Sequence, residues 1–143
     1  MNQRVVHFTV PGVPIAQPRP RVTRNGTYVP KSHAIHGYRR DVMLAYTKLG
    51  GVYGATFEAA VSIGITFWFP RPKRLAMLAE VIPKTTRPDL DNLAKGVLDS
   101  LQNYAFGDDS NVVELRLSKW YVRDGTLART EISIRDAGGV ADD

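Results

Sequence analysis

Apolar and polar residues alternate along several stretches of the chain, which is the pattern of strands that bury one face. The clearest stretch is 58–69, where alternate positions are held by Ala59, Val61, Ile63, Ile65, Phe67 and Phe69. Residues 113–121 and 127–135 alternate in the same way, and residues 5–10 form a β-branched run that ends at a proline and a glycine. Because Asp124-Gly125 is a typical tight-turn pair, we expect 113–121 and 127–135 to form a hairpin.

Two other segments show the three- and four-residue spacing of amphipathic helices. Residues 33–49 carry one apolar stripe, made of Ile35, Tyr38, Val42, Ala45 and Leu49. Ser32 is placed to cap this helix and Gly50-Gly51 to end it. Residues 91–104 carry a second apolar stripe, made of Leu93, Ala94, Val97, Leu98 and Leu101.

The predicted elements are joined by two basic, proline-bearing connections. Residues 11–31 hold four of the nine prolines, so we expect a stiff extended loop. Residues 70–88 form the second connection, in which 75–81 is predicted as a short helix. The resulting order β-α-β-α-β-β predicts an α+β domain over residues 1–136, with both helices packed on a mixed sheet, and a frayed tail at 137–143.

Composition narrows the class of protein. The 143 residues suffice for one compact core, and a hydrophobic content of 43% is ordinary for a globular domain. The absence of cysteine excludes a disulfide scaffold, a cysteine zinc site and a thiol nucleophile. No apolar run approaches the roughly 18–20 residues of a membrane span, and the first residues lack the pattern of a secretory signal. We therefore expect a soluble cytoplasmic protein with no membrane partner.

Charge is distributed unevenly along the chain. The formal net charge is +5, from 19 basic and 14 acidic residues. Residues 1–40 contain seven of the basic residues and no acidic residue, so the acidic residues outnumber the basic ones in the remainder. A basic N-terminal segment favours a polyanionic partner such as nucleic acid.

The polar face of the predicted helix at 91–104 carries the candidate chemistry. It presents Asp91, Lys95 and Asp99 at intervals of four residues. One interpretation is structural, with Asp91 as an ordinary N-cap and the others as a solvated ladder of ion pairs. The other interpretation starts from Asp89, because one N-cap needs no second carboxylate before it. Two carboxylates at the start of a helix, together with the pair Asp108-Asp109 in the next loop, can converge on a hard cation such as Mg²⁺.

The run Asp89-x-Asp91-Asn92-x-x-Lys95, followed by Asp99, Leu101 and Asp108-Asp109, resembles the RusA-type Holliday junction resolvases of bacteria and their phages. The order of elements and the basic, proline-rich N-terminal loop are also similar, over about residues 4–135. The resemblance implies a homodimeric endonuclease that depends on Mg²⁺, or on Mn²⁺ in its place. It implies paired symmetric nicks in four-way DNA junctions during recombination and repair.

The resemblance also implies roles for individual residues. The expected metal ligands are Asp89, Asp91 and Asp109, and the expected catalytic residues are these three together with Lys95. The residues expected beside the ligands, without binding the metal, are Asn92, Asp99 and Asp108. We expect Asp99 to position Lys95, and a plain surface ion pair is the alternative for these two residues.

A DNA substrate would also give the basic connections a role. The candidates for phosphate contacts are Arg19, Arg21, Arg24, Lys31, Arg71, Lys73 and Arg74. For each of them a solvated surface charge is the alternative. Two other functions stay open on the sequence alone. One is a non-catalytic nucleic-acid-binding module, and the other is a metal-dependent nuclease for RNA or for other branched DNA.

Overall fold

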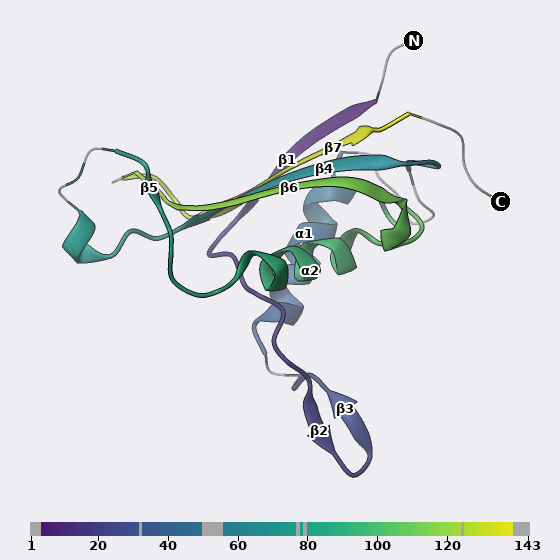
Figure 1. Ribbon diagram of the computed structural model, residues 1–143, viewed down its shortest axis with the longest axis horizontal. Helices are drawn as coiled ribbons and strands as arrows, with labels where there is room; N and C mark the ends of the chain where they lie inside the picture. The colour runs from purple at the N-terminus through teal and green to yellow at the C-terminus, as the bar shows by residue number, and fades with distance from the viewer. Residues whose placement is uncertain are drawn as a thin grey trace.

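Two helices lie against one face of a five-stranded mixed sheet (Figure 1). The structure is a computed structural model, and it describes residues 4–31, 33–49, 56–76, 78, 80–123 and 125–138. The sheet has the order β1-β7-β4-β6-β5. Its strands are β1 (Val5–Pro11), β4 (Val61–Phe69), β5 (Ile82–Pro83), β6 (Val112–Tyr121) and β7 (Arg129–Asp136). The predicted α+β class is confirmed.

The core lies between the sheet and the two helices, α1 (Ile35–Thr47) and α2 (Leu90–Leu101). On β4 the alternate residues Val61, Ile63, Ile65, Phe67 and Phe69 are buried, as the alternation predicts, and Ser62 is the one further residue of the strand that is buried. Ile132 and Ile134 of β7 extend the same buried face to one side. Removal of this apolar surface from water is the main force that holds the helices on the sheet. Among the described residues, no helix is long and apolar enough to cross a membrane.

The apolar stripe of α1 differs from the predicted one at its end. Ile35, Tyr38 and Val42 are buried as expected, but the fourth buried residue is Tyr46. Leu49 is 51% exposed, because the helix ends at Thr47 and the stripe no longer continues beyond it. The proposed cap Ser32 and the terminating Gly50-Gly51 lie outside the described residues.

The predicted hairpin of β6 and β7 is wrong. A turn is present, since the N–H of Thr126 donates to the carbonyl of Arg123 at 3.0 Å, although Asp124 itself lies outside the described residues. The two strands, however, pair with opposite sides of β4, which is parallel to β6 and antiparallel to β7. In this position β7 has a neighbour on both sides, and its inward residues Ile132 and Ile134 are fully covered.

The connection at 11–31 is also more ordered than predicted. It contains a second, two-stranded sheet, the hairpin of β2 (Arg21–Thr23) and β3 (Gly26–Tyr28). The pair Asn25-Gly26 is a strong hairpin signal, and Gly26 has the positive φ of +115° that such turns require. The sequence therefore contained the information, but the surrounding prolines favoured the loop interpretation.

The helix predicted at 75–81 is replaced by a short 3₁₀ turn, η1 (Lys73–Leu75), and no described residue from 76 to 81 is helical. The side chain of Arg71 explains the difference. Its guanidinium donates to the carbonyls of Val122, Leu75, Leu78 and Glu80, including bonds of 2.9 Å to Val122 and 2.6 Å to Glu80. Because these carbonyls accept from Arg71, they are held in a loop and do not accept the backbone hydrogen bonds of a helix.

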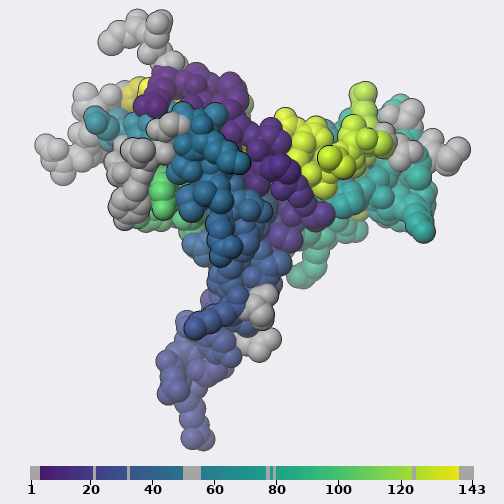
Figure 2. Space-filling view, turned by 180° about the vertical axis from the view of Figure 1, so that it is seen from behind, coloured from purple at the N-terminus to yellow at the C-terminus, as the bar shows by residue number. Residues whose placement is uncertain are grey.

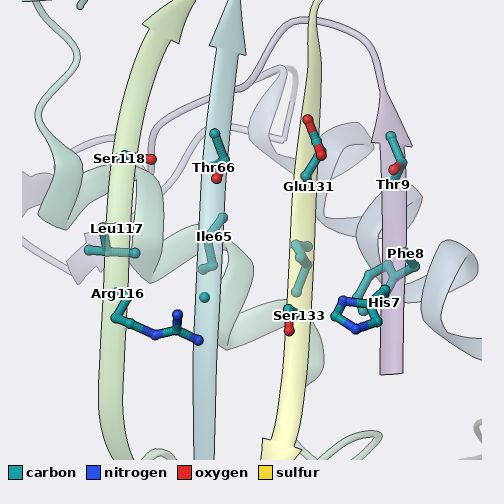
Figure 3. A pocket seen from close by; sticks show the side chains of 12 residues that line it. His7, Phe8, Thr9, Ile65, Thr66, Arg116, Leu117, Ser118, Glu131 and Ser133 are labelled. Carbon is teal, nitrogen blue, oxygen red and sulfur yellow. The ribbon is translucent and has the colours of Figure 1, made fainter. Parts of the chain in front are cut away.

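The face of the sheet opposite to α1 and α2 contains a hollow of about 560 Å³ (Figure 3). Arg116 extends from β6 across β4, over Gly64, where an added Cβ would stand 3.2 Å from its Nη2. The charges on this face are paired, since Glu114 lies 3.2 Å from Arg135 and 3.6 Å from Arg116. The candidate carboxylates lie on the other, helical side of the sheet.

We predict that Tyr38→Phe destabilises the protein by about 1–3 kcal/mol, because it leaves the buried Thr130 hydroxyl without its partner. The Tyr38 hydroxyl lies 2.6 Å from Thr130 Oγ1, and burial raises the pKa of Tyr38 to about 12. Because the pKa of Tyr38 is higher in the folded state than in the unfolded state, its contribution to the free energy of unfolding is fully present below pH 10. This contribution falls as the pH rises toward 12. Chemical denaturation at neutral and alkaline pH tests both points. The double variant Tyr38→Phe with Thr130→Val leaves no unpaired hydroxyl, so most of the stability lost in Tyr38→Phe should be recovered. A double variant whose loss equals the sum of the two single losses would contradict the pairing.

Candidate active site

Asp89 and Asp91 stand at the start of α2. Asp89 holds the N-cap position with an extended backbone, φ −78° and ψ 150°, and its carbonyl accepts the first helical bond from Leu93. An aspartate in this position ordinarily caps the helix through its side chain. Here the Asp89 side chain makes no capping hydrogen bond, and both carboxylates are exposed. The carboxylate of Asp89 is therefore available to a ligand.

Lys119 holds the segment that leads into these carboxylates. Its Nζ donates to the carbonyls of Thr86 and Pro88, both at 2.8 Å. Lys119 pairs in register with the buried Phe67, so it occupies the inward phase of β6. Sequence reasoning missed this residue. The available signal was a lysine at a position where the alternation of β6 calls for an apolar side chain.

Lys95 and Asp99 form the predicted pair one turn apart, with Nζ and Oδ2 separated by 3.9 Å. The Lys95 side chain is 61% exposed and that of Asp99 is 20% exposed. Asp109 lies beside this pair. Partial burial raises the pKa of Asp109, repulsion from Asp99 and Asp108 raises it further, and Lys95 opposes the shift. The ionised form of Asp109 is thus less favoured than in a free aspartate, and a further cation nearby would stabilise it.

The structure distinguishes the two neighbouring aspartates. Asp108 caps the 3₁₀ turn η2 (Asp109–Asn111), where its carboxylate accepts from the N–H of Ser110 at 3.0 Å and Asn111 completes a capping box. Hydrogen bonds from Ser110 lower the pKa of Asp108. Within the described residues the carboxylate of Asp109 accepts no hydrogen bond. Asp108 is therefore committed to the turn, whereas Asp109 is available to a ligand.

The carboxylates form a line along α2 rather than a closed cage. Asp91 and Asp99 are eight residues apart, which is roughly 12 Å along a helix axis. Among the described residues, no three acidic or histidine side chains are close enough together to hold a metal by themselves. The chemistry of these groups nevertheless suits Mg²⁺, since the carboxylates of Asp89, Asp91 and Asp109 are exposed and accept no hydrogen bond within the described residues. Asn92 is exposed, and its carbonyl accepts from the N–H of Gln17 at 3.0 Å.

The side chains of six of the seven basic candidates are described, and they fall into two groups. Five of them are exposed, and these are Arg19, Arg24, Lys31, Lys73 and Arg74. Arg71 differs, because its guanidinium is engaged with backbone carbonyls and orders the loop that carries Lys73 and Arg74. The side chain of Arg21 lies outside the described residues.

Comparison with known proteins identifies the family. Residues 11–135 match the family described as Endodeoxyribonuclease RusA. The chain belongs to the RusA family. It is also 32% identical over 140 residues to the uncharacterized protein YqaN of Bacillus subtilis, covering 92% of this chain and 96% of that protein. RusA-family proteins of bacteria and phages are endodeoxyribonucleases that resolve Holliday junctions, so this RusA-family chain is an endonuclease of branched DNA.

We predict that Lys119→Met loosens the start of α2, because the carbonyls of Thr86 and Pro88 lose a charged donor. The expected loss is about 1–3 kcal/mol in denaturant unfolding. Hydrogen–deuterium exchange should become faster over residues 86–93. Lys119→Arg keeps a charged donor and is the control. Unchanged exchange in Lys119→Met would show that the two bonds do not hold this segment.

We predict opposite effects of two neighbouring substitutions in metal-free buffer. The raised pKa of Asp109 means that stability falls as the pH rises through this pKa, so Asp109→Asn should raise the melting temperature at pH 7 by a few degrees or less. The lowered pKa of Asp108 means that its contribution is present at neutral pH and is lost in acid, so Asp108→Asn should lower the melting temperature. Both differences should shrink below about pH 4, where the unfolded carboxyls are protonated. The same sign for both variants at pH 7 would refute the distinction.

Proposed function

We propose that this protein resolves four-way DNA junctions by paired symmetric nicks, in recombination and repair, with Mg²⁺ as cofactor and Mn²⁺ as an accepted substitute. The proposed metal ligands are Asp89, Asp91 and Asp109. The observation that carries the proposal is the carboxylate pair at the start of α2, in which Asp89 holds the N-cap position without capping.

The chemistry of Mg²⁺ suits this arrangement. The ion takes oxygen ligands, keeps several waters, and in enzymes of phosphate chemistry is held by one or two carboxylates together with the substrate phosphate. A complete cage of protein ligands is therefore not needed before DNA arrives. A cation close to Asp109 would relieve the repulsion that this carboxylate experiences from Asp99 and Asp108. When bound, the metal would activate a water and neutralise charge on the scissile phosphate.

Lys95 is the proposed catalytic cation. It stands one turn from Asp91 and one turn from Asp99, and its exposed side chain can reach a phosphate that approaches α2. Its positive charge would stabilise the negative charge that develops on the phosphate oxygens. Asp99, at 3.9 Å, positions the Lys95 side chain. Asp108 acts through the turn it caps, which carries Asp109.

The exposed basic residues Arg19, Arg24, Lys31, Lys73 and Arg74, and also Arg21, would contact phosphates on the arms of the junction. Arg71 would act indirectly, by ordering the loop of Lys73 and Arg74. We propose a homodimer, because a twofold pair of identical sites matches two symmetric nicks in a pseudo-symmetric substrate. The proposed compartment is the bacterial cytoplasm, where that DNA substrate is found.

We predict that the protein nicks a labelled four-way junction at symmetric positions with Mg²⁺ or Mn²⁺ and that EDTA abolishes the nicks. Asp91→Asn should reduce the rate on the order of a hundredfold or more, because it removes a charged ligand. The matched control is Asp41→Asn, the same change at an exposed position on α1. Denaturing gels of each labelled strand give the rates and the positions of the cuts.

Three results would contradict the proposal. These are tight junction binding without cleavage under any divalent metal, cleavage that persists in EDTA, and equal rates for Asp91→Asn and Asp41→Asn. Faster cleavage of flapped DNA or RNA than of the junction would move the proposal to a different substrate. Light scattering tests the dimer, for which twice the chain mass of 15.9 kDa is expected.

A further inference from the structure

The hairpin of β2 and β3 projects away from the sheet and both helices (Figures 1 and 2). Every side chain that the structure describes from Val22 to Tyr28 is exposed. Val22 is 82% exposed and Tyr28 is 48% exposed. A two-stranded hairpin without a covering layer is only marginally stable in water, so this arm gains little from the fold that carries it.

The two apolar side chains lie on opposite faces of the arm. Val22 pairs with Thr27, and Tyr28 is the next residue on that strand. Because neighbouring residues of a strand point to opposite faces, Tyr28 faces away from the side of Val22. A partner that lies flat on the arm covers only one of them. A partner into which the arm is inserted covers both.

Charge indicates the class of partner. Residues 1–40 contain no acidic residue, and Arg19, Arg24 and Lys31 around the hairpin are exposed. Such a segment attracts a polyanion. A two-stranded ribbon also has the dimensions that fit between DNA backbones. DNA therefore accounts for both the charge and the shape of the arm, whereas an apolar protein partner accounts only for Val22 and Tyr28.

The chain segments before and after the arm contact the helix that carries the candidate site. On the incoming side the N–H of Gln17 donates to the carbonyl of Asn92 at 3.0 Å. On α2, a Cβ added to Gly96 would stand 3.1 Å from Ile35 Cδ1 and 3.8 Å from the carbonyl oxygen of Ile15. Glycine at position 96 thus lets the incoming segment and the start of α1 pack closely on α2. Residues 15–17 before the arm and Ile35 after it are therefore held against the helix that carries Asp91 and Lys95.

We propose that the β2–β3 hairpin inserts into the branch point of the DNA substrate, where Val22 and Tyr28 contact bases that the branch leaves accessible. In a linear duplex the faces of the bases are stacked, and apolar side chains find them only where stacking is interrupted. The arm then selects branched over linear DNA and sets the distance from the branch to the carboxylates on α2. This inference rests on the proposed function for its substrate.

The test compares binding of a four-way junction and of a linear duplex in EDTA, where cleavage plays no part. Val22→Ser with Tyr28→Ser should weaken junction binding about tenfold or more, since one base–aromatic contact is worth roughly 1–3 kcal/mol, and should leave duplex binding unchanged. The matched control is Leu127→Ser, which removes an apolar side chain that is 83% exposed outside the arm. Equal melting temperatures of all variants check that each is folded.

Two further measurements separate insertion from surface contact. A fluorescent base analogue at the branch should change its emission on binding the wild type and not on binding the double variant. Arg24→Ala should weaken junction and duplex alike and reduce the salt slope by about one, as expected for a phosphate contact. Unchanged junction binding by the double variant, or an equal loss for duplex and junction, would overturn the inference. A wild type that binds through the arm but cleaves nothing would overturn the proposed function and leave this inference standing.

Discussion

The parallel pairing of β4 with β6 is the constraint on which the rest of the structure depends. Two parallel strands cannot be joined by a tight turn, so the chain must cross over a face of the sheet between them. In this protein α2 is the main element of that crossover. The apolar face of α2 packs on the sheet, and its polar face, with Asp91, Lys95 and Asp99, is left toward solvent. The candidate site thus owes its place to backbone pairing rather than to the side chains that form it.

The sequence predicted local elements well and their partners poorly. The spacing of apolar residues in β4 and α2 is visible within each segment of the sequence, so both elements and their buried faces were predictable. The partner of β7 was not, because the turn signal at Asp124-Gly125 is local whereas the gain from placing Ile132 and Ile134 between β1 and β4 is not. For the β2–β3 hairpin the local turn signal was the correct one. The pair Asn25-Gly26 indicated a hairpin, whereas the prolines of the same segment indicated an extended loop.

The same distinction applies to the candidate site. Helical spacing alone placed Lys95 and Asp99 one turn apart, and the structure has them at 3.9 Å. The different states of Asp108 and Asp109 depend on the capping of a three-residue turn, which spacing does not reveal. Lys119 binds backbone carbonyls more than thirty residues away, and Arg71 binds one that is 51 residues away besides three nearby, and no sequence motif describes such bonds. The position of Asp109 near Lys95 and Asp99 is likewise a property of the crossover and not of the motif.

The interior position of β7 in the sheet has a consequence for the synthesis of the protein. Among the described residues β7 is the last strand, yet it joins β1, the first described strand, to β4. When α2 has emerged from the ribosome, the nascent chain therefore still lacks β7, the strand that lies between β1 and β4 in the sheet. Chains dominated by such distant pairings also fold slowly. The sheet on which α2 packs is therefore complete only after residues 129–136 have been synthesised.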